Sequence, residues 1–512
     1  MPWLVAAGAS GALLALAFPR PAVEALAWVG LVPLLLVAGQ RPSWSGIVAG
    51  FVCFAAVLSW VTHPLTRYGG LPWAPSVLLY LLLAGYLALY VGAVTWATCR
   101  LDGRLGAPRW LAFPVLWVGA EHARSFLLTG FPWALLGYSQ QGSLALLQSA
   151  DLAGPYGLSF LLALANAVTA DAIRAARGHP RRPLPWGGIG ALAALLALTW
   201  GYGTWRLARE PEGAGQPLRV AVVQGNVEQA VKWDPAFQRE TIGRYTELSA
   251  SSGAERADLI IWPETAVPFR FDEGDPLAEE VRRTARETGA FLLFGAPRRQ
   301  LADGQERYFN SAFLLGPGGE SAGVTDKVHL VPFGEYVPLQ SLLPFAEKLG
   351  AGAGDFSPGR AELLPAGDAR LGVLVCFEAI FPALARDLAA RGADLLVNLT
   401  NDAWFGDTAA PYQHLGMARF RAVENRVWLV RAANTGISAL VDPAGRVVGS
   451  LPLFQAGRMD GVVRVGTSRS TGYQGWGGRF PAGCLALSLA GLAATVVVGR
   501  RPGPRLRLAP GP

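Results

Sequence analysis

The sequence is short of charged residues, of lysine and of cysteine, and each shortage excludes a class of protein. Only 16% of its 512 residues are charged, whereas about a quarter are charged in soluble globular domains. Hydrophobic residues make up 52% and the mean hydropathy is +0.31, so we expect part of the chain to lie in a membrane. The formal net charge of +7 comes mostly from arginines whose placement matters more than their sum, and we expect no nucleic-acid partner.

The few cysteines and lysines further limit the kinds of site that the protein can contain. The cysteines are Cys53, Cys99, Cys376 and Cys484, three of them in apolar segments and none in the CxxC spacing of a metal site. The sequence therefore predicts no disulfide scaffold, no metal and no organic cofactor. The lysines are Lys232, Lys327 and Lys348. Because arginine is the default cation of this chain, a retained lysine indicates a position that a guanidinium does not suit. Codon bias that favours arginine can also leave a lysine in place by chance.

Apolar residues concentrate before residue 207 and after residue 480. They form about eight stretches, each near the length that crosses a bilayer: 3–19, 23–39, 44–65, 73–98, 109–128, 155–173, 186–206 and 481–499. The first lacks the basic start of a signal peptide, so we expect a retained helix. The sequence predicts a polytopic membrane domain over 1–206, a soluble domain over 207–480, a last transmembrane helix over 481–499 and a basic tail over 500–512.

Arginine is distributed unequally between the two sides of the predicted membrane domain. With the N-terminus inside, the cytoplasmic loops carry Arg41, Arg100, Arg104, Arg109, Arg174, Arg177, Arg181 and Arg182, and the tail is also basic. The opposite side has little more than Arg20, Arg67 and Arg124. The positive-inside rule then predicts a multi-pass protein with both termini in the cytoplasm and residues 207–480 on the extracytoplasmic side.

Aromatic and turn residues separate the fifth and sixth predicted spans, in segments 129–133 (TGFPW) and 154–157 (GPYG). They form either an interfacial aromatic belt or a surface through which lipid reaches the soluble domain. Glu121 and Arg124 stand one helical turn apart at a span end. We expect a structural pair there, although intramembrane charge often marks function.

Residues 207–480 alternate short β-rich runs with amphipathic helical stretches. The expected strands are 219–223, 259–262, 291–294, 311–315, 371–375, 395–399, 429–433 and 437–441, and the expected helices include 275–288 and 382–391. Such alternation predicts a layered α/β domain. Ligands of α/β sheets collect beyond the carboxyl ends of strands. Glu264 and Cys376, each directly after a strand, are therefore expected to converge with Lys327, which follows a glycine-rich turn.

Each of these three residues also has an ordinary structural explanation. Cys376 could be a small core residue, Glu264 a solvated loop carboxylate and Lys327 a surface charge. A helix start shortly after the cysteine favours a thiolate, the proline before Glu264 fixes its backbone, and lysine is rare here. Together the three can form a nucleophile, its base and its oxyanion stabiliser. His329 and His414 lack the spacing of a His–Cys dyad, and we expect both to be structural.

Three motifs resemble the Glu-Lys-Cys signature of the nitrilase superfamily. They are Trp262-Pro263-Glu264, the run from Asp326-Lys327 to Gly334-Glu335, and Val375-Cys376-Phe377-Glu378. With the membrane segments and the segments 131–133, 224–226, 232–234, 333–338 and 401–406, they make nearly the whole chain similar to the bacterial apolipoprotein N-acyltransferases, a membrane-bound branch of that superfamily. The resemblance implies an αββα nitrilase-like sandwich attached to the bacterial cytoplasmic (inner) membrane, with the sandwich on the periplasmic side.

The resemblance also implies roles for individual residues. Glu264 would be the general base, Lys327 the oxyanion stabiliser and Cys376 the nucleophile, while the family also needs positions that match Trp233, Glu335 and Glu378. The implied reaction passes an acyl chain from a membrane phospholipid, through a cysteine thioester, to the N-terminal amine of a diacylglyceryl-cysteine on an apolipoprotein. The family often has tyrosine after the cysteine. Phe377 stands there, so either the hydroxyl is dispensable or the ring serves mainly in packing.

Two other functions could use the same chain. A membrane-tethered nitrilase-type amidase would use water as the acceptor, although it needs no extensive membrane domain. A transport or scaffold protein would only bind ligand, although it has no need of all three reactive groups. The apolar segment 339–348 and the glycine-rich 350–354 are expected to form either a mobile lid between bilayer and site or a plain surface loop.

Overall fold

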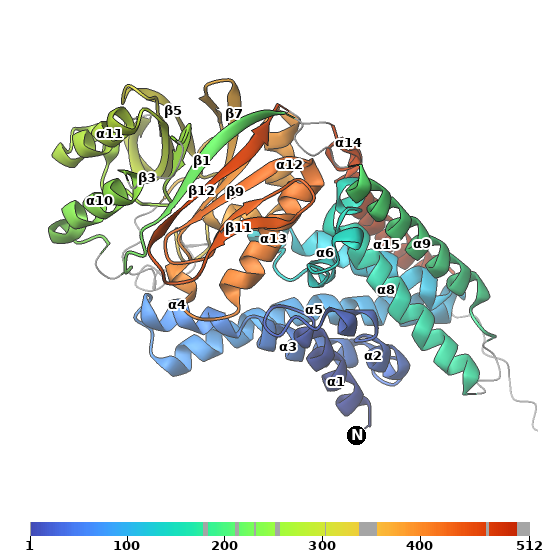
Figure 1. The fold of residues 1–512 in the computed structure, drawn as a ribbon. Helices are drawn as coiled ribbons and strands as arrows, with labels where there is room; N and C mark the ends of the chain where they lie inside the picture. The colour runs from blue at the N-terminus through green and yellow to red at the C-terminus, as the bar shows by residue number, and fades with distance from the viewer. Residues whose placement is uncertain are drawn as a thin grey trace, which may run out of the picture.

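Two six-stranded sheets packed face to face form the centre of the molecule, with the apolar helices at one end (Figure 1). The structure, a computed structural model, describes residues 2–177, 183–209, 215–229, 232–250, 256–302, 304–336, 356–466 and 470–498. The first sheet has the order β12-β1-β2-β3-β4-β5 and the second the order β11-β10-β9-β8-β7-β6.

The two sheets share one plan, in which three parallel strands are extended by antiparallel ones. The first consists of β1 (Gln216–Gln224), β2 (Leu259–Ile261), β3 (Phe291–Ala302), β4 (Gln305–Leu315), β5 (Ser321–Asp326) and β12 (Gly457–Val465), with β1 to β3 parallel. The second consists of β6 (Leu363–Ala366), β7 (Ala369–Val375), β8 (Leu395–Thr400), β9 (Trp428–Ala433), β10 (Ser438–Val441) and β11 (Val447–Leu451), with β7 to β9 parallel. Every strand expected from the sequence overlaps an observed strand.

Helices cover the outer face of each sheet. α10 (Pro235–Ala250) and α11 (Pro276–Thr288) pack on the first sheet, and α12 (Pro382–Ala390) and α13 (Ala410–Asn425) pack on the second (Figure 1). Central strands are buried on both faces, which explains why they read as continuous apolar runs. The αββα sandwich is thus confirmed. α11 begins where Asp275 accepts a hydrogen bond from the backbone of Leu277, a standard N-cap.

The remaining helices are rich in apolar residues. They are α1 (Pro2–Leu16), α2 (Val32–Val37), α3 (Pro42–Val57), α4 (Thr62–Arg67), α5 (Trp73–Leu105), α6 (Arg109–Arg124), α7 (Leu144–Leu147), α8 (Ala150–Ala176), α9 (Trp186–Ala208), α14 (Gly472–Trp476) and α15 (Arg479–Val497). By length and composition α5, α8 and α15 could each cross a membrane, and α3 with the bent segment Ser59–Arg67 would make a fourth span.

Helix length therefore does not establish eight spans among the described residues. The expected stretch 23–39 is divided into the short 3-10 helix Glu24–Trp28 and α2, because Gly30 and Pro33 interrupt the helix between them. The stretch 109–128 is helical only as far as Arg124. A chain that lies in a membrane as broken helices satisfies its freed backbone groups inside the protein, and apolar composition alone does not reveal such breaks.

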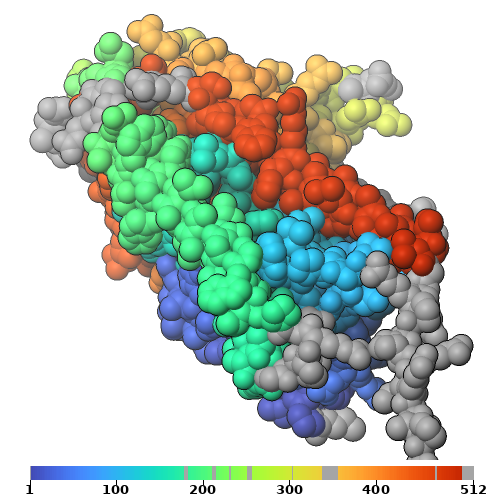
Figure 2. All heavy atoms as spheres, turned by 90° about the vertical axis from the view of Figure 1, so that its right-hand side faces the viewer, coloured from blue at the N-terminus to red at the C-terminus, as the bar shows by residue number. Residues whose placement is uncertain are grey.

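Large apolar side chains are exposed on the helices at this end. Figure 2 shows α9 and α15 on one face of the molecule, where Leu198 is 68% exposed, Leu487 65% and Val496 72%. An exposed apolar surface of this kind suits hydrocarbon better than water. Membrane insertion accounts for it directly.

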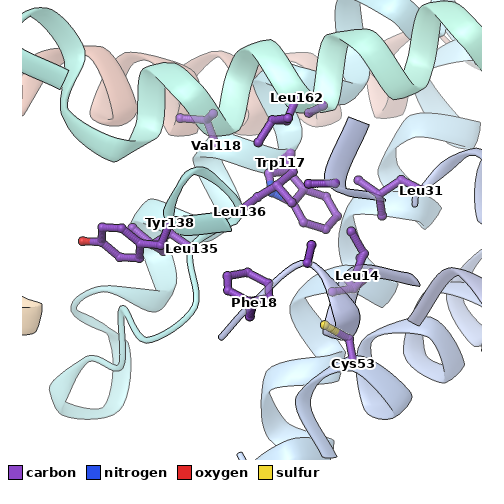
Figure 3. Close-up of a cluster of buried hydrophobic side chains, with 14 of the residues drawn as sticks. Leu14, Phe18, Leu31, Cys53, Trp117, Val118, Leu135, Leu136, Tyr138 and Leu162 are labelled. Carbon is purple, nitrogen blue, oxygen red and sulfur yellow. The ribbon is translucent and has the colours of Figure 1, made fainter. Parts of the chain in front are cut away.

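Inside, one apolar cluster joins the membrane-type helices to the sandwich. Figure 3 shows its centre, where Leu14 and Phe18 face Trp117 and Leu136. The same cluster includes Phe377, Phe405 and Phe420 of the sandwich. The sandwich therefore packs directly against the helical end through apolar side chains.

Candidate active site

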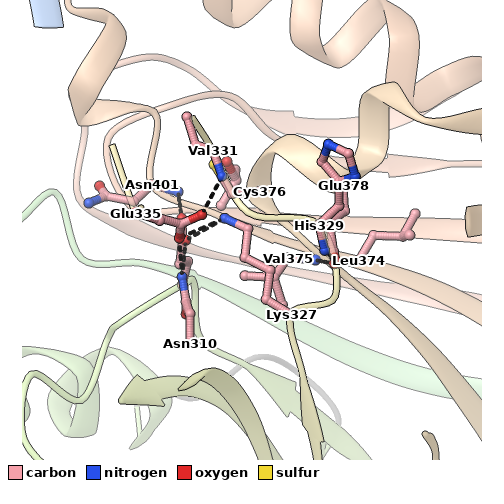
Figure 4. Close-up of polar contacts among 12 residues, drawn as sticks. Asn310, Lys327, His329, Val331, Glu335, Leu374, Val375, Cys376, Glu378 and Asn401 are labelled. Atoms are coloured by element: carbon pink, nitrogen blue, oxygen red, sulfur yellow. Dashed lines mark hydrogen bonds and ion pairs between the residues drawn. The ribbon is translucent and has the colours of Figure 1, made fainter. Parts of the chain in front are cut away.

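The three reactive residues expected to converge do lie together. Glu264 follows β2 and Lys327 follows β5, both in the first sheet, whereas Cys376 follows β7 in the second. Lys327 Nζ lies 3.7 Å from Glu264 Oε1, and both residues act electrostatically on the Cys376 thiol. Figure 4 shows the side chains of Lys327, Glu335 and Cys376 directed toward one region. The two sheets thus bring an acid–base pair and a thiol to the same end of the sandwich.

Glu264 is buried and held from both sheets, so the explanation as a solvated loop carboxylate is wrong. It is 6% exposed. Its Oε1 accepts a hydrogen bond from Asn310 Nδ2 on β4 (2.8 Å), and its Oε2 accepts one from the backbone N–H of Asn401 after β8 (2.9 Å). A Cβ on Gly295 would come within 2.4 Å of the Thr265 nitrogen. Glycine at that position lets the turn that carries the carboxylate lie against β3.

Lys327 is a buried ammonium rather than a surface charge. It is 1% exposed, and its Nζ lies 2.9 Å from Glu335 Oε1. Burial by itself lowers the lysine pKa, but Glu335 and Glu264 together raise it above its ordinary value, so the group stays charged. Glu335 also accepts hydrogen bonds from Asn310 Nδ2 (3.0 Å) and the Val331 backbone N–H (2.8 Å). It fixes the ammonium in place.

Cys376 occupies a strained position on a tight turn. Its φ is +52°, which for a residue other than glycine costs about 1–3 kcal/mol, and its carbonyl accepts hydrogen bonds from Asn398 Nδ2 (3.3 Å) and His414 Nε2 (3.1 Å). Burial and the charge of Glu264 raise the thiol pKa, and Lys327 offsets this only in part. The expectation that the helix start favours a thiolate is therefore wrong, because desolvation outweighs it. The thiol is protonated at rest and needs a base.

The side chains of Asp402, His414 and Arg431 form a buried ionic cluster next to Cys376. His414 Nδ1 lies 3.3 Å from Asp402 Oδ1, and Arg431 Nη2 lies 2.6 Å from Asp402 Oδ2. Burial would raise the Asp402 pKa, but Arg431 more than offsets this and holds it below its usual range. Burial and Arg431 lower the His414 pKa, so the ring is neutral. Because a carbonyl can only accept, the proton sits on Nε2, which donates to Cys376. His414 is structural, as expected.

Glu378 ties the turn of the nucleophile to the loop of the lysine. One of its oxygens accepts hydrogen bonds from the backbone N–H groups of Val328 (2.7 Å) and His329 (2.9 Å), and the other accepts one from Val375 (2.7 Å). Burial raises the pKa of Glu378 to about 7, although the nearby lysine and these N–H groups act against it. Its contacts are all to backbone, which makes it a positioning residue.

The contacts of Phe377 bear on the two explanations for phenylalanine at this position, a dispensable hydroxyl or a ring that serves mainly in packing. Its ring centroid lies 6.2 Å from that of Phe131, 5.3 Å from Phe381 and 6.1 Å from His329. Phe131 belongs to the loop after α6. The side chain after the cysteine therefore serves in packing, where the sandwich meets the membrane-type helices.

Trp233, the other residue expected at the site, is 45% exposed. Its neighbour Lys232 is fully buried, and its Nζ donates a hydrogen bond to the backbone carbonyl of Glu264 (3.0 Å). The segment 339–354, expected as a lid or a surface loop, lies outside the described residues.

Sequence reasoning missed the residues that hold the carboxylates. Asn310 bridges Glu264 and Glu335, and it gave no clear signal because it lies next to Ser311 in a strand that also contains Gln305, Glu306 and Arg307. Lys232 gave two signals, its rarity and its place in the segment 232–234, but neither indicated its partner. Burial of the lysine against a carbonyl depends on the folded chain and cannot be read from its neighbours in sequence.

Glu121 and Arg124, expected as a structural pair, hold the loop that follows them. Glu121 Oε1 accepts a hydrogen bond from the Leu136 backbone N–H (2.7 Å), and Arg124 Nη1 donates to the Trp133 carbonyl (3.0 Å). The indole of Trp133 then donates to Gln413 Oε1 of the sandwich (2.7 Å). These charges are structural, and through the loop they connect α6 to α13.

Known proteins match the sequence of this chain over nearly its whole length. The family model described as "Apolipoprotein N-acyltransferase N-terminal domain" matches residues 10–168, and the model described as "Carbon-nitrogen hydrolase" matches residues 219–473. A protein of Geobacter metallireducens named apolipoprotein N-acyltransferase is 48% identical over 483 residues, which covers 93% of this chain and 92% of that protein. One of Pseudomonas putida with the same name is 37% identical over 502 residues, covering 93% and 95%.

Among solved structures, an amidase from Nesterenkonia sp. AN1 is 25% identical, with a TM-score of 0.37, and covers 49% of this chain and 93% of that one. Saccharomyces cerevisiae Nit3, a member of the nitrilase superfamily, is 20% identical with a TM-score of 0.38, covering 49% and 90%. The relatives that cover 93% of this chain show which family it belongs to. This chain belongs to the apolipoprotein N-acyltransferase family.

Proposed function

We propose that this protein transfers an acyl chain from a membrane phospholipid to the N-terminal amine of the S-diacylglyceryl-cysteine of an apolipoprotein, through a thioester on Cys376. One observation carries the proposal. A protonated thiol, a buried carboxylate and a buried ammonium meet at one point, on a domain whose apolar core continues into helices suited to a membrane. Relatives similar over 93% of the chain carry the name of this activity.

In the first step the thiol is acylated. Glu264 takes the proton of Cys376 as the sulfur attacks the ester carbonyl of the phospholipid, and Lys327 stabilises the oxyanion that forms. The ester C–O bond then breaks, and the lysophospholipid leaves with the proton returned by Glu264. Because burial raises the pKa of the thiol, this step depends on the base.

In the second step the acceptor amine attacks the thioester carbonyl. Glu264 takes a proton from the amine, the C–S bond breaks, and the proton returns to the sulfur of Cys376. The product is an amide, which is more stable than the thioester. Two substrates use one site in turn, so ping-pong kinetics follow.

The proposed arrangement in the membrane has about eight spans, seven within 1–206 and one over 481–499, with the sandwich (207–480) on the extracytoplasmic side of the bacterial inner membrane and the tail (500–512) in the cytoplasm. Two ion pairs support it. Arg20 lies 3.0 Å from Asp407, and Arg67 lies 3.7 Å from Glu228. The few cations of the predicted outer loops thus contact the sandwich, whereas the arginine-rich loops are predicted on the other side.

The test is the intact mass of the purified protein after incubation with a phospholipid alone, beside a Cys376→Ala control. The proposal expects an added acyl mass on the wild type, none on the control, and discharge of the adduct by a diacylated lipopeptide with formation of its amide. Discharge by water at the same rate with or without the lipopeptide would instead indicate the tethered hydrolase. Full lipoprotein maturation by Cys376→Ala in cells would leave only a binding or transport role.

A further inference from the structure

Lys232 is a buried cation beside the proposed base, and the two steps above give it no role. Its side chain is 0% exposed, and its Nζ donates a hydrogen bond to the Glu264 carbonyl at 3.0 Å. It comes from the segment before α10, which carries none of the three reactive residues. Removing an ammonium from water costs several kcal/mol unless opposite charges compensate. Negative groups nearby therefore have to offset at least part of this cost for Lys232 to be charged near neutral pH.

The charges of the site balance when Lys232 is included. Glu264 and Glu335 are two carboxylates, whereas Lys327, paired with both, is one ammonium. Lys232 is a second ammonium, and Glu264 and Cys376 both act on it electrostatically. Without it, the buried base and the thiol would share an uncompensated negative charge, which moves from Glu264 to the sulfur when Glu264 takes the thiol proton.

The residue type agrees with this position. Arginine is the usual cation of the chain, and only three lysines occur. A guanidinium is wider than an ammonium and needs planar partners, whereas Lys232 is fully enclosed and meets a single backbone oxygen with a compact head group.

We propose that Lys232 is a positioning residue for acylation, which fixes the turn that aims Glu264 and supplies a positive charge that compensates the negative charge as it passes from Glu264 to the sulfur of Cys376. This inference rests on the proposed function, since it concerns the step in which the thioester forms. It adds a residue from a fourth segment to the three that the mechanism already uses.

The pH dependence of acylation follows from the same group. Burial lowers the pKa of Lys232 to about 8, although Glu264 and Cys376 act to raise it. The cation paired with Glu264 is Lys327, which stays protonated because Glu335 and Glu264 raise its pKa. Asp402 acts on the thiol from the second sheet. The compensating charge is therefore present below pH 8 and is lost above it.

The experiment measures the rate of acyl adduct formation with phospholipid alone, so that titration of an acceptor amine, with a pKa near 8, does not enter. Wild type is compared with Lys232→Met, which keeps the length and removes the charge, and with Lys232→Arg, which keeps the charge. We expect Lys232→Met to be acylated about 30-fold more slowly near neutral pH, which is less than the roughly 10²–10⁴-fold typical for loss of a general base because Glu264 itself remains. The wild-type rate should fall above about pH 8, and neither variant should show that fall, because neither titrates there.

The controls separate a fold defect from the proposed role. The melting temperature and the alkylation of Cys376 by iodoacetamide report whether Lys232→Met folds with its thiol in place. If neither variant folds, the wild-type profile still decides, since an acylation rate that does not fall above about pH 8 would overturn the proposal. Acylation of a folded Lys232→Met within about threefold of wild type would overturn it as well. A wild-type protein that forms no adduct would instead contradict the proposed function.

Discussion

The two sheets of the sandwich contribute different things to one site. The first sheet supplies charge, with Glu264 and Lys327 at strand ends and Asn310 between the carboxylates. The second supplies the thiol on a strained turn, whose carbonyl is held by neutral donors from Asn398 and His414. Proton transfer thus depends mainly on the first sheet, and the placement of the nucleophile depends mainly on the second. Substitutions in the two sheets should therefore fail in different ways.

The largest difference is expected for Glu264→Gln in the first sheet. The amide oxygen can accept a hydrogen bond from Asn310 or from Asn401 but not from both, because the two donors bind different oxygens of the carboxylate, and the amide cannot take the proton of the thiol. We expect acylation by phospholipid to fall about 10²–10⁴-fold, the usual range for loss of a general base. Iodoacetamide alkylation of Cys376 at alkaline pH should remain close to wild type, and the lost hydrogen bond should lower the melting temperature only modestly. A lower melting temperature with unchanged acylation would show that Glu264 is structural.

His414→Ala tests the second sheet. It leaves the Cys376 carbonyl and the Arg431 guanidinium, whose Nη2 lies 3.1 Å from His414 Nδ1, each short of a partner, and each buried polar group left unsatisfied costs about 1–3 kcal/mol. We therefore expect a clear fall in melting temperature together with about tenfold slower acylation, because the turn of the nucleophile loses its support. Unlike Glu264→Gln, this variant should change the rate at which iodoacetamide alkylates the thiol. His414→Gln is the matched control, because its amide can still donate a hydrogen bond. It should recover part of the melting temperature and part of the acylation rate.

Glu378 joins the two sheets, so its substitution should combine both effects. In Glu378→Gln one end of the side chain presents N–H to backbone N–H, which breaks either the contacts to Val328 and His329 or the contact to Val375. We expect about tenfold slower acylation. Because the pKa of Glu378 is raised to about 7, its carboxylate takes up a proton as the pH falls through 7, and the wild-type rate should fall with it. The variant should lack that fall, and an identical acidic limb in both proteins would assign it to another group.

The sequence was sufficient for features that depend on local pattern. Buried strands read as apolar runs, and the reactive residues stood directly after them, which is why Glu264 and Cys376 could be identified before the fold was seen. The sequence was misleading for properties that depend on burial in the folded protein. It favoured a thiolate at Cys376, whereas desolvation raises the thiol pKa. It also missed Asn310 and Lys232, whose contacts with Glu264 span 46 and 32 residues of sequence.

The helical end shows the same limit. Apolar length predicted a continuous span over 23–39, but Gly30 and Pro33 divide it, because composition measures affinity for hydrocarbon and not helix continuity. The roles of Glu121 and Arg124 were likewise hidden. Their partners are backbone atoms of a loop with no regular structure, and such partners leave no pattern in the sequence.

The smallest effect is expected where the second sheet meets the helical end. Phe377 packs among Phe131, Phe381 and His329, so Phe377→Tyr keeps the ring that matters, and we expect acylation within about threefold of wild type. Phe377→Ala is the contrast, since deleting a buried phenyl ring costs about 3–5 kcal/mol and loosens the contact between the sandwich and the loop after α6. The measurement is acylation of each variant with phospholipid presented in bilayers and in detergent micelles. If the tyrosine variant were much slower or much faster than wild type in both, a hydroxyl at this position would act on the chemistry, and the second sheet would contribute more than the placement of its thiol.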